Sequence, residues 1–283
     1  MAQDDMPTMR SRRLGGELRR LRLEAGLKVQ QVADALECGQ PKISQIENGK
    51  RGIRPLDLTT FFNLVKLEDE QHRNNLRRLA KQIHKVDWWS GDGPILDDSL
   101  RDYLTLEVDS ELVRTYQSDL IPGLLQTESY MREIFSTNER PDMVDHLVST
   151  RLKRQELLED ANGFRFRAVI DAPALHRIAG GSDVVREQLS HLIEVGKKSN
   201  VTIQVLPLDA ALPMDQHVPY SILSQRGDPP VDIAWLEHLT GGTLLEQRSQ
   251  VQVYAGFWDE LTAAAMSPSA SQRYMRDLIK ERG

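Results

Sequence analysis

Two glutamines near residue 40 carry side chains that can read base pairs in duplex DNA. Gln40 and Gln45 lie about one helical turn apart, and a glutamine amide can both donate to and accept from one adenine edge in the major groove. Lys42, between them, can reach guanine or a phosphate, and Ser44 can hydrogen-bond to a phosphate. On a helix that enters the major groove, Gln40, Lys42 and Gln45 could contact the bases and Ser44 the backbone.

Basic residues surround the segment from Gln40 to Gln45. Lys and Arg that neutralise phosphates supply most of the affinity for DNA of any sequence. For each such residue the plain alternative is a solvated surface charge. The expected backbone contacts come from Lys50, Arg51 and Arg54 in a loop after the segment, from Arg12 and Arg13 near the N-terminus, and from Lys28 and Gln30 before it.

The charge of the chain is unevenly divided. The 283 residues carry a net charge of −6, which by itself disfavours DNA binding. Residues 1–90, however, hold 17 Lys and Arg against 12 Asp and Glu, whereas residues 91–283 hold 19 against 30. The basic part is therefore predicted to meet double-stranded DNA, and the acidic part to stay off it.

The elements that position the two glutamines are short helices. Apolar spacing over residues 14–25 predicts a first helix that ends at Gly26. A second helix, barely two turns long, follows over 29–36, and Pro41 lies in the first turn of a third helix that Gly49 closes. Two short helices joined by a tight turn are typical of a helix-turn-helix, although such helices also occur in all-helical domains of other function.

Residues 12–66 resemble the lambda/434 repressor family, also called the Xre-type helix-turn-helix. The resemblance implies a five-helix domain whose third helix enters the major groove, with DNA contacts at both glutamine positions. It also implies that Glu47 pairs with Arg22 of the first helix, which makes this carboxylate structural. The matching residues are Leu14-Gly15, Leu18-Arg19, Ala25-Gly26-Leu27, Val32-Ala33, Leu36 and the run from Lys42 to Gly49.

Length and a change of pattern near residue 88 predict two domains. A chain of 283 residues exceeds what one hydrophobic core usually organises. We expect an all-α helix-turn-helix domain over 1–85, a linker over 86–100 and a C-terminal regulatory and dimerisation domain over 101–283. The adjacent Trp88-Trp89 are expected to dock on this C-terminal domain.

The C-terminal domain is predicted to be α/β (α+β), with a small mixed sheet covered by helices. Runs of apolar and β-branched residues predict strands at about 112–116, 164–170, 201–206, 219–223 and 231–236. Helices are predicted at about 127–135, 142–159, 182–197, 247–265 and 268–281.

Five segments of this domain resemble the C-terminal domain of WhiJ-like regulators of actinobacteria, which are Xre-type proteins. The resemblance implies a transcriptional regulator, often encoded beside a small partner protein. The segments are Tyr103–Glu107, Pro122–Thr127, Arg151–Gln155, Val201–Pro207 and Glu237–Gly241.

A regulator needs an input, and an apolar pocket with a few polar groups is the usual place for one. We expect Gln126, Arg151, Trp235 and Glu237 to line an effector pocket for a small molecule. The alternative for Trp235 is ordinary packing in the core.

Catalysis is a competing role for the C-terminal domain. Asp232, Glu237 and His238, with His217 upstream, are candidates for acid/base chemistry. The sequence has no Gly-x-Ser-x-Gly, no phosphate-binding glycine loop and no His-Glu-x-x-His, and its seven histidines lack metal-ligand spacing. We therefore expect no enzyme, no catalytic residue, no metal and no cofactor.

The expected protein is a cytoplasmic, sequence-specific DNA-binding regulator that acts as a homodimer on an inverted repeat. Its single cysteine, Cys38, and the lack of any long apolar run predict a reducing compartment and no membrane partner. The alternative is an antitoxin-like interaction module that binds a small protein from a neighbouring gene and autoregulates its operon.

Overall fold

The computed structural model describes residues 7–85, 87, 89, 98–137, 141–159, 163–211, 218–227, 230–238 and 240–282. Most of the expected linker, Trp88 and His217 lie outside these residues. The chain divides into two compact units, the first chiefly within residues 1–91 and the second chiefly within 92–283. Among the helices of the described residues, none combines the length and apolar character needed to cross a membrane.

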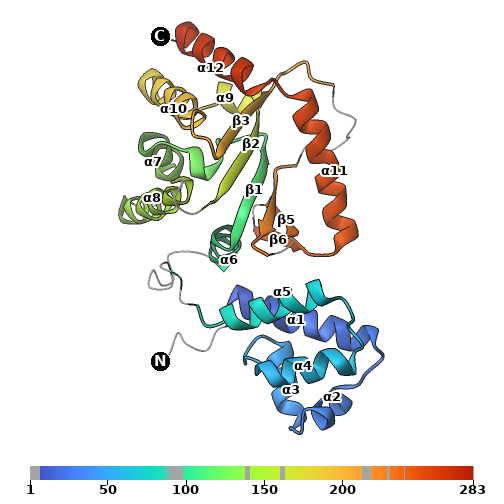
Figure 1. The fold of residues 1–283 in the computed structure, drawn as a ribbon. Coiled ribbons are helices and arrows are strands. Elements are labelled where there is room, and N and C mark those ends of the chain that lie inside the picture. Colours follow the sequence, from blue (N-terminus) through green and yellow to red (C-terminus); the bar gives the residue numbers. More distant parts are fainter. Residues whose placement is uncertain are drawn as a thin grey trace. The chain divides into compact units, whose positions relative to one another are not determined.

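The N-terminal unit is built from helices, as the blue and cyan part of Figure 1 shows, and this confirms the expected all-α domain. Thr8 caps the first helix by accepting a hydrogen bond from the backbone N–H of Ser11 over 3.2 Å. Prolines occupy the first turns of the third and fourth helices, where a backbone N–H has no acceptor within the helix, so its absence in proline costs no hydrogen bond. The helices are α1 (Met9–Glu24), α2 (Val29–Ala35), α3 (Gln40–Glu47), α4 (Pro55–Leu64) and α5 (Glu70–Gln82).

All five helices contribute to one apolar core. Leu18 of α1, Ala33 of α2, Ile43 of α3, Phe62 of α4 and Leu76 of α5 are all buried within it. Their burial fixes which face of each helix points outward, because residues three and four apart share a face. In α3 the outward face is therefore the one that carries the polar side chains.

The C-terminal unit contains a six-stranded mixed sheet with the strand order β3-β2-β1-β4-β5-β6. The central strand β1 pairs parallel with β2, and β2 pairs parallel with β3. On the other side of β1, the strands β4, β5 and β6 continue the sheet by antiparallel pairing. The strands are β1 (Ser110–Gln117), β2 (Arg165–Asp171), β3 (Val201–Leu206), β4 (Tyr220–Gln225), β5 (Val231–His238) and β6 (Gly241–Leu245).

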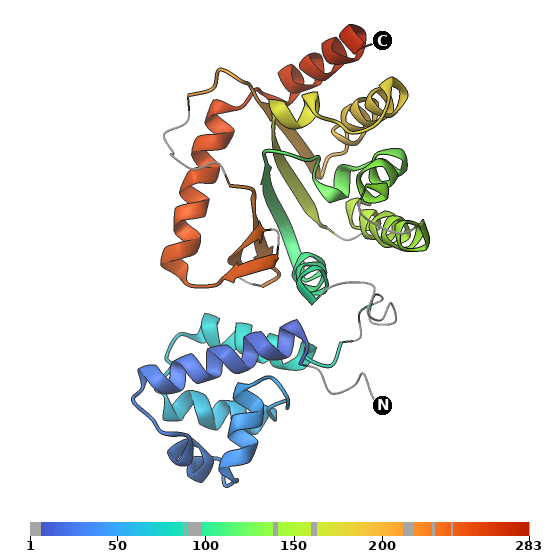
Figure 2. The same cartoon turned by 180° about the vertical axis from the view of Figure 1, so that it is seen from behind.

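Helices cover both faces of this sheet (Figures 1 and 2), which confirms the expected α/β architecture. The helices α7 (Glu128–Ser136), α8 (Pro141–Gln155) and α10 (Ser182–Val195) lie on one face, and α11 (Arg248–Ala264) lies on the other. The remaining helices are α6 (Asp98–Val108), α9 (Ala172–His176), α12 (Pro268–Arg282) and the 3-10 turns η4 (Gly123–Leu125) and η5 (Glu156–Leu158).

The structure adds elements that the sequence did not predict. Helix α6 begins at Asp98, three residues before the expected start of the C-terminal domain, and β6 and α9 were not anticipated. Thr127, by contrast, caps α7 by accepting from the N–H of Tyr130 over 3.3 Å, at the start that its residue type indicates.

The strand register determines which side chains share the sheet face opposite α11. Thr115 of β1 pairs with Ser221 of β4, and Ser221 pairs with Trp235 of β5. Because side chains alternate along a strand, Gln117 and Glu237, two residues further on, lie on this same face. Polar and aromatic side chains thus line one continuous region of the sheet.

Candidate functional site

Helix α3 presents a polar face at the surface of the N-terminal unit. Gln40, Ser44 and Gln45 are exposed, whereas Ile43 and Ile46 are each 3% exposed. The spacing of four and five residues places the three polar side chains on one side of the helix. Side chains of these types on an uncovered helix can meet both base edges and phosphates.

Gln40 is held by a side chain of α2. Its Nε2 donates to Oε1 of Gln30, and Nε2 of Gln30 donates to Oδ1 of Asp34 over 2.6 Å. This relay orients the Gln40 amide, and amide orientation decides which base edge it can match. Gln30, expected to contact the DNA backbone, is therefore also placed to position Gln40.

Lys42 is engaged within the protein. Its Nζ lies 2.7 Å from Oδ2 of Asp57, a buried residue of α4. Arg54 reaches the same carboxylate, with Nη2 2.8 Å from Oδ1. Arg54 and, less strongly, Lys42 hold the pKa of Asp57 below its ordinary value although burial opposes them. Lys42 thus ties α3 to α4, and the base contact expected of it requires its ammonium group to leave Asp57.

The other basic residues differ in exposure. Lys28, Lys50, Arg51 and Arg54 are exposed, and the exposed side chain of Arg54 nonetheless keeps its ion pair with Asp57. Arg12 and Arg13, on α1, are half-buried. The loop that follows α3 therefore offers the most accessible cations next to the polar face.

A buried ion pair joins α1 to the last turn of α3. Nε and Nη2 of Arg22 lie 2.6 and 2.8 Å from the two carboxylate oxygens of Glu47, and each side chain is 7% exposed. Nη1 of Arg22 also donates to the carbonyl oxygen of Leu27 over 2.9 Å. The hydrogen bond with Glu47 raises the pKa of Arg22. The structure thus brings together the two residues that the repressor resemblance pairs.

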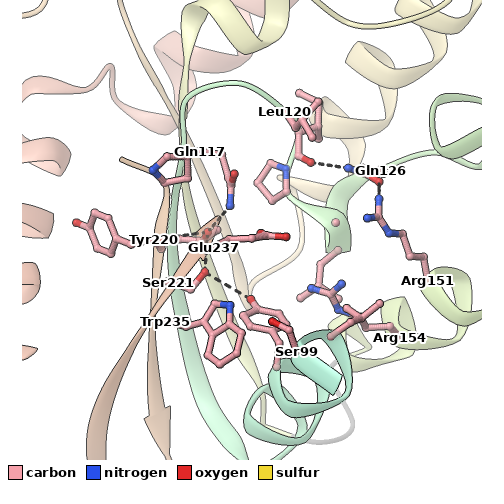
Figure 3. A pocket seen from close by; sticks show the side chains of 18 of the residues that line it. Ser99, Gln117, Leu120, Gln126, Arg151, Arg154, Tyr220, Ser221, Trp235 and Glu237 are labelled. Atoms are coloured by element: carbon pink, nitrogen blue, oxygen red, sulfur yellow. Dashed lines mark hydrogen bonds between the residues drawn. The ribbon is translucent and has the colours of Figure 1, made fainter. Parts of the chain in front are cut away.

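The C-terminal unit contains a cavity of about 560 Å³ beside the sheet face opposite α11 (Figure 3). Its volume suits a small organic molecule. All four residues expected in an effector pocket, Gln126, Arg151, Trp235 and Glu237, line it. The apolar part of its wall includes Leu100, Leu120, Leu124, Phe135, Met143 and Leu147.

The sheet side of the cavity combines an indole ring with hydroxyl groups. Trp235 lies so close to Gly242 of β6 that a β-carbon there would be 1.9 Å from Cζ2 of the indole. The Trp235 ring lies 5.8 Å from the Tyr103 ring of α6, measured between centroids. Oγ of Ser221 donates to Oγ1 of Thr115 over 3.0 Å. Glycine at position 242 therefore leaves room for the indole that forms this wall.

Arg154 and Tyr103 line the cavity but were not identified from the sequence, although both fall in segments that carry the WhiJ-like resemblance. Arg154 forms a bidentate pair with Glu107 of α6, in which Nη2 lies 2.8 Å from Oε1. Burial opposes the charge of Arg154, but Glu107 offsets burial and raises the pKa of Arg154. Its guanidinium lies 5.2 Å from the Tyr103 ring centroid and close to Gly123, where a β-carbon would be 3.0 Å from Nη1.

Arg151, one turn before Arg154 on α8, has a different environment. Its Nη1 donates to Oε1 of Gln126, and its guanidinium lies 4.5 Å from the centroid of the Phe135 ring. Gln126 is buried and anchored, because its Nε2 donates to the carbonyl oxygen of Ile121 over 2.7 Å. Burial, with repulsion from Arg154, lowers the pKa of Arg151 to about 10. No carboxylate of the described residues forms an ion pair with Arg151.

Glu237 faces the cavity from the sheet. Figure 3 shows its side chain extending from β5 towards the wall that carries Arg151 and Arg154. Glu237 is exposed, and among the described residues its carboxylate has neither an ion pair nor a hydrogen-bond partner. Two opposite charges, those of Arg151 and Glu237, thus face one cavity without pairing with each other.

Among the described residues weighed for acid/base catalysis, Asp232 lies apart from Glu237 and His238. Asp232 lies on the opposite sheet face from Glu237, since strand positions alternate, and its Oδ2 lies 2.5 Å from Nη2 of Arg114. His238 lies within 3.3 Å of Thr243 and 3.2 Å of Thr240 through its two ring nitrogens. The described residues contain no group of three side chains placed to hold a metal ion.

Two families of known domains match separate parts of the chain. A helix-turn-helix domain matches residues 13–76, a range that contains all of α2, α3 and α4 and therefore the polar face of α3. A family described as a domain of unknown function (DUF5753) matches residues 100–277. No curated protein matches the sequence. Because the second match spans more than half of the chain, this protein belongs to the DUF5753 family, and its helix-turn-helix domain marks it as a DNA-binding regulator.

Proposed function

We propose that this protein is a sequence-specific transcriptional regulator of the Xre type, related to the WhiJ-like regulators of actinobacteria. It binds an inverted-repeat operator as a homodimer, and the cavity of its C-terminal unit receives a small-molecule effector. The observation that carries the proposal is the exposed polar face of α3, on which Gln40, Ser44 and Gln45 lie together. Such a regulator works where the chromosome is, in the cytoplasm.

The roles of the side chains follow from their placement. Gln40, oriented by Gln30, and Gln45 read base edges in the major groove. Lys42 joins them where the DNA draws its ammonium away from Asp57. The backbone phosphates are neutralised by Lys28, Lys50, Arg51 and Arg54, with Arg12, Arg13, Gln30 and Ser44 as further contacts.

Replacing both glutamines tests the reading of bases. The operator is first found by mapping the binding sites of the protein across the genome, and affinities are then measured for operator and random duplexes. The double variant Gln40→Ala with Gln45→Ala should lower the affinity for the operator to that for random DNA, while salt-dependent binding to random DNA remains. Gln71→Ala, an exposed glutamine of α5, serves as the control. If the double variant still prefers the operator, α3 is not the reading helix.

Replacing the loop cations tests the contacts to phosphate. Lys50→Ala and Arg51→Ala should weaken binding to all sequences alike and each reduce the slope of log affinity against log salt by about 1. Lys81→Ala, at an exposed position in the last turn of α5, should leave the slope unchanged. An unchanged slope in the loop variants would remove these residues from the DNA interface.

A small protein encoded by a neighbouring gene is the alternative input, as the resemblance to WhiJ-like regulators implies. Co-purification of this chain with the product of the adjacent gene tests it. The cavity is the observation that favours a small molecule instead.

A further inference from the structure

We propose that the cavity of the C-terminal unit binds an amphoteric small molecule, with an oxyanion at one end and a cationic amine at the other. Arg151 binds the oxyanion, a carboxylate or a phosphate, and Glu237 binds the amine. The inference rests on the proposed role of the cavity as the effector site and names the chemistry of its ligand.

Among the described residues, Arg151 has no carboxylate in an ion pair with it, unlike Arg154 on the same helix. A buried charge is costly unless another charge compensates it, and its neighbour Arg154 has such a partner in Glu107. Arg151 contacts the neutral oxygen of Gln126 and the ring of Phe135, and the charge of Glu237 acts on it without forming an ion pair. A guanidinium has five N–H donors, so the hydrogen bond to Gln126 leaves donors for a bidentate oxyanion.

The surroundings of Arg151 hold its planar group in place. Phe135 packs against the guanidinium, and the Gln126 amide that contacts it is fixed to the backbone at Ile121. The carbonyl of Gln126 accepts in turn from Nε2 of Gln155 over 2.6 Å. A positioned guanidinium loses little freedom when it binds an anion, which favours affinity.

Arg151 and Glu237 are separated across the cavity. The two side chains face the same cavity from different elements, α8 and β5, and do not form an ion pair. A ligand with one charge would satisfy one of these groups and leave the other without a partner in a site that the ligand has closed to water. A ligand with both charges satisfies both. Its middle part can pack against apolar residues that also line the cavity, among them Leu120, Met143 and Trp235.

The test is a series of two-headed compounds, each compared with its one-headed relatives. The full-length protein is titrated by calorimetry, without DNA, with 4-aminobutanoate, 6-aminohexanoate, 8-aminooctanoate and L-phenylalanine. Each is matched with the acid that lacks the amine and the amine that lacks the acid. We expect at least one two-headed compound to bind about tenfold more tightly than both of its relatives. The comparison of 2-aminoethyl phosphate with 3-aminopropanoate identifies the preferred oxyanion.

Variants assign each end of the ligand. Arg151→Met should remove the advantage over the amine alone, and Glu237→Gln should remove the advantage over the acid alone. Arg186→Met of α10 and Glu260→Gln of α11, both exposed, are the controls. The proposal is overturned if no two-headed compound exceeds its relatives, or if both variants keep the wild-type preferences.

Thermal melting separates a binding role of Arg151 from a structural one. Arg154→Met leaves the buried carboxylate of Glu107 without its partner and should lower the Tm. Arg151→Met leaves the buried Oε1 of Gln126 without its donor but leaves no charge without its partner, so it should lower the Tm by less than Arg154→Met does. An equal loss of Tm in both variants would make Arg151 structural and overturn the proposal. The calorimetry and the melting experiments contain no DNA. If the protein failed to recognise an operator, the proposed function would be contradicted, but the result for the ligand class would still hold.

Discussion

Each unit of the protein contains one bidentate Arg–Glu pair that joins two helices. Arg22 and Glu47 connect α1 to α3, and Arg154 and Glu107 connect α6 to α8. Both pairs are buried, so neither partner is easily replaced by water. At the scale of the residue, these pairs fix the helices that carry the glutamines of α3 and Arg151 of α8.

Glu47→Ala is expected to unfold the N-terminal unit. It leaves the Arg22 guanidinium buried without its partner, a change that commonly costs about 3–5 kcal/mol. Urea denaturation should show this loss in the transition of the N-terminal unit, and DNA binding should disappear with it. Glu24→Ala removes an exposed pair with Arg20 and should cost about 1 kcal/mol or less. A Glu47→Ala protein with wild-type stability would contradict the structural role of this residue.

Sequence reasoning predicted residue types better than residue partners. The glutamines of α3 could be identified because their chemistry follows from their type and position. Lys42 was expected at the bases, but its ammonium lies at Asp57, fifteen positions later. Arg151 and Arg154 are three residues apart on one helix, and only the folded position of Glu107 distinguishes the neutralised arginine from the other.

At the scale of the element, α1 and α3 approach each other closely at one glycine. A β-carbon on Gly15 would lie 2.4 Å from the carbonyl oxygen of Ile46, and one on Gly16 would meet nothing within 4 Å. Gly15→Ala must therefore push α3 away from α1, at a cost of about 1–3 kcal/mol. The loss should appear in urea denaturation and as weakened operator binding.

The neighbouring glycine provides the control. Gly16→Ala places the better helix former at an exposed position of α1 and should stabilise the unit by up to about 1 kcal/mol. Equal effects of the two alanines would show that α1 and α3 are not in close contact at Gly15.

The link between α3 and α4 predicts a dependence on pH. Arg54 and Lys42 hold the pKa of Asp57 below that of the unfolded chain, so the ionised carboxylate stabilises the fold. Its contribution is present above the pKa of the unfolded chain and is lost as pH falls through the lower folded value. Urea denaturation from neutral pH down to about pH 3 should show a shallower acid loss for Asp57→Asn than for the wild type. Matching acid slopes would contradict the role of this carboxylate.

Elements whose apolar residues repeat with a clear period were predicted well. Elements that depend on contacts formed only in the folded protein were missed. The helix expected over about 182–197 is α10, Ser182–Val195. Strand β6 opens with Gly241-Gly242, residues of low strand propensity. The reason for Gly242 is the Trp235 indole above it, which no local pattern reveals. Helix α6 follows a Gly- and Pro-rich stretch that indicated a linker, and no helix was predicted there.

At the scale of the whole molecule, the two units differ in charge, and the basic one carries the helix-turn-helix domain. The cavity with its two unpaired charges lies in the acidic, larger unit, and the exposed polar helix lies in the basic one. We expect the proposed effector to act on DNA binding by changing an equilibrium between states of the protein. The strength of this coupling is the factor by which the effector changes the affinity for the operator. The operator changes the affinity for the effector by the same factor.

The symmetry of the proposed dimer predicts the spacing of the operator. Two copies of α3 that read one face of the duplex require half-sites about 10–10.5 base pairs apart, or a multiple of this, centre to centre. Inserting five base pairs between the half-sites turns one of them to the opposite face and should reduce affinity to that of a single half-site. Inserting ten base pairs restores the face and should recover part of the loss, limited by how far the dimer can extend. Because both insertions keep every contacted base, equal affinity for all three duplexes in quantitative footprinting would mean that each monomer binds its half-site independently.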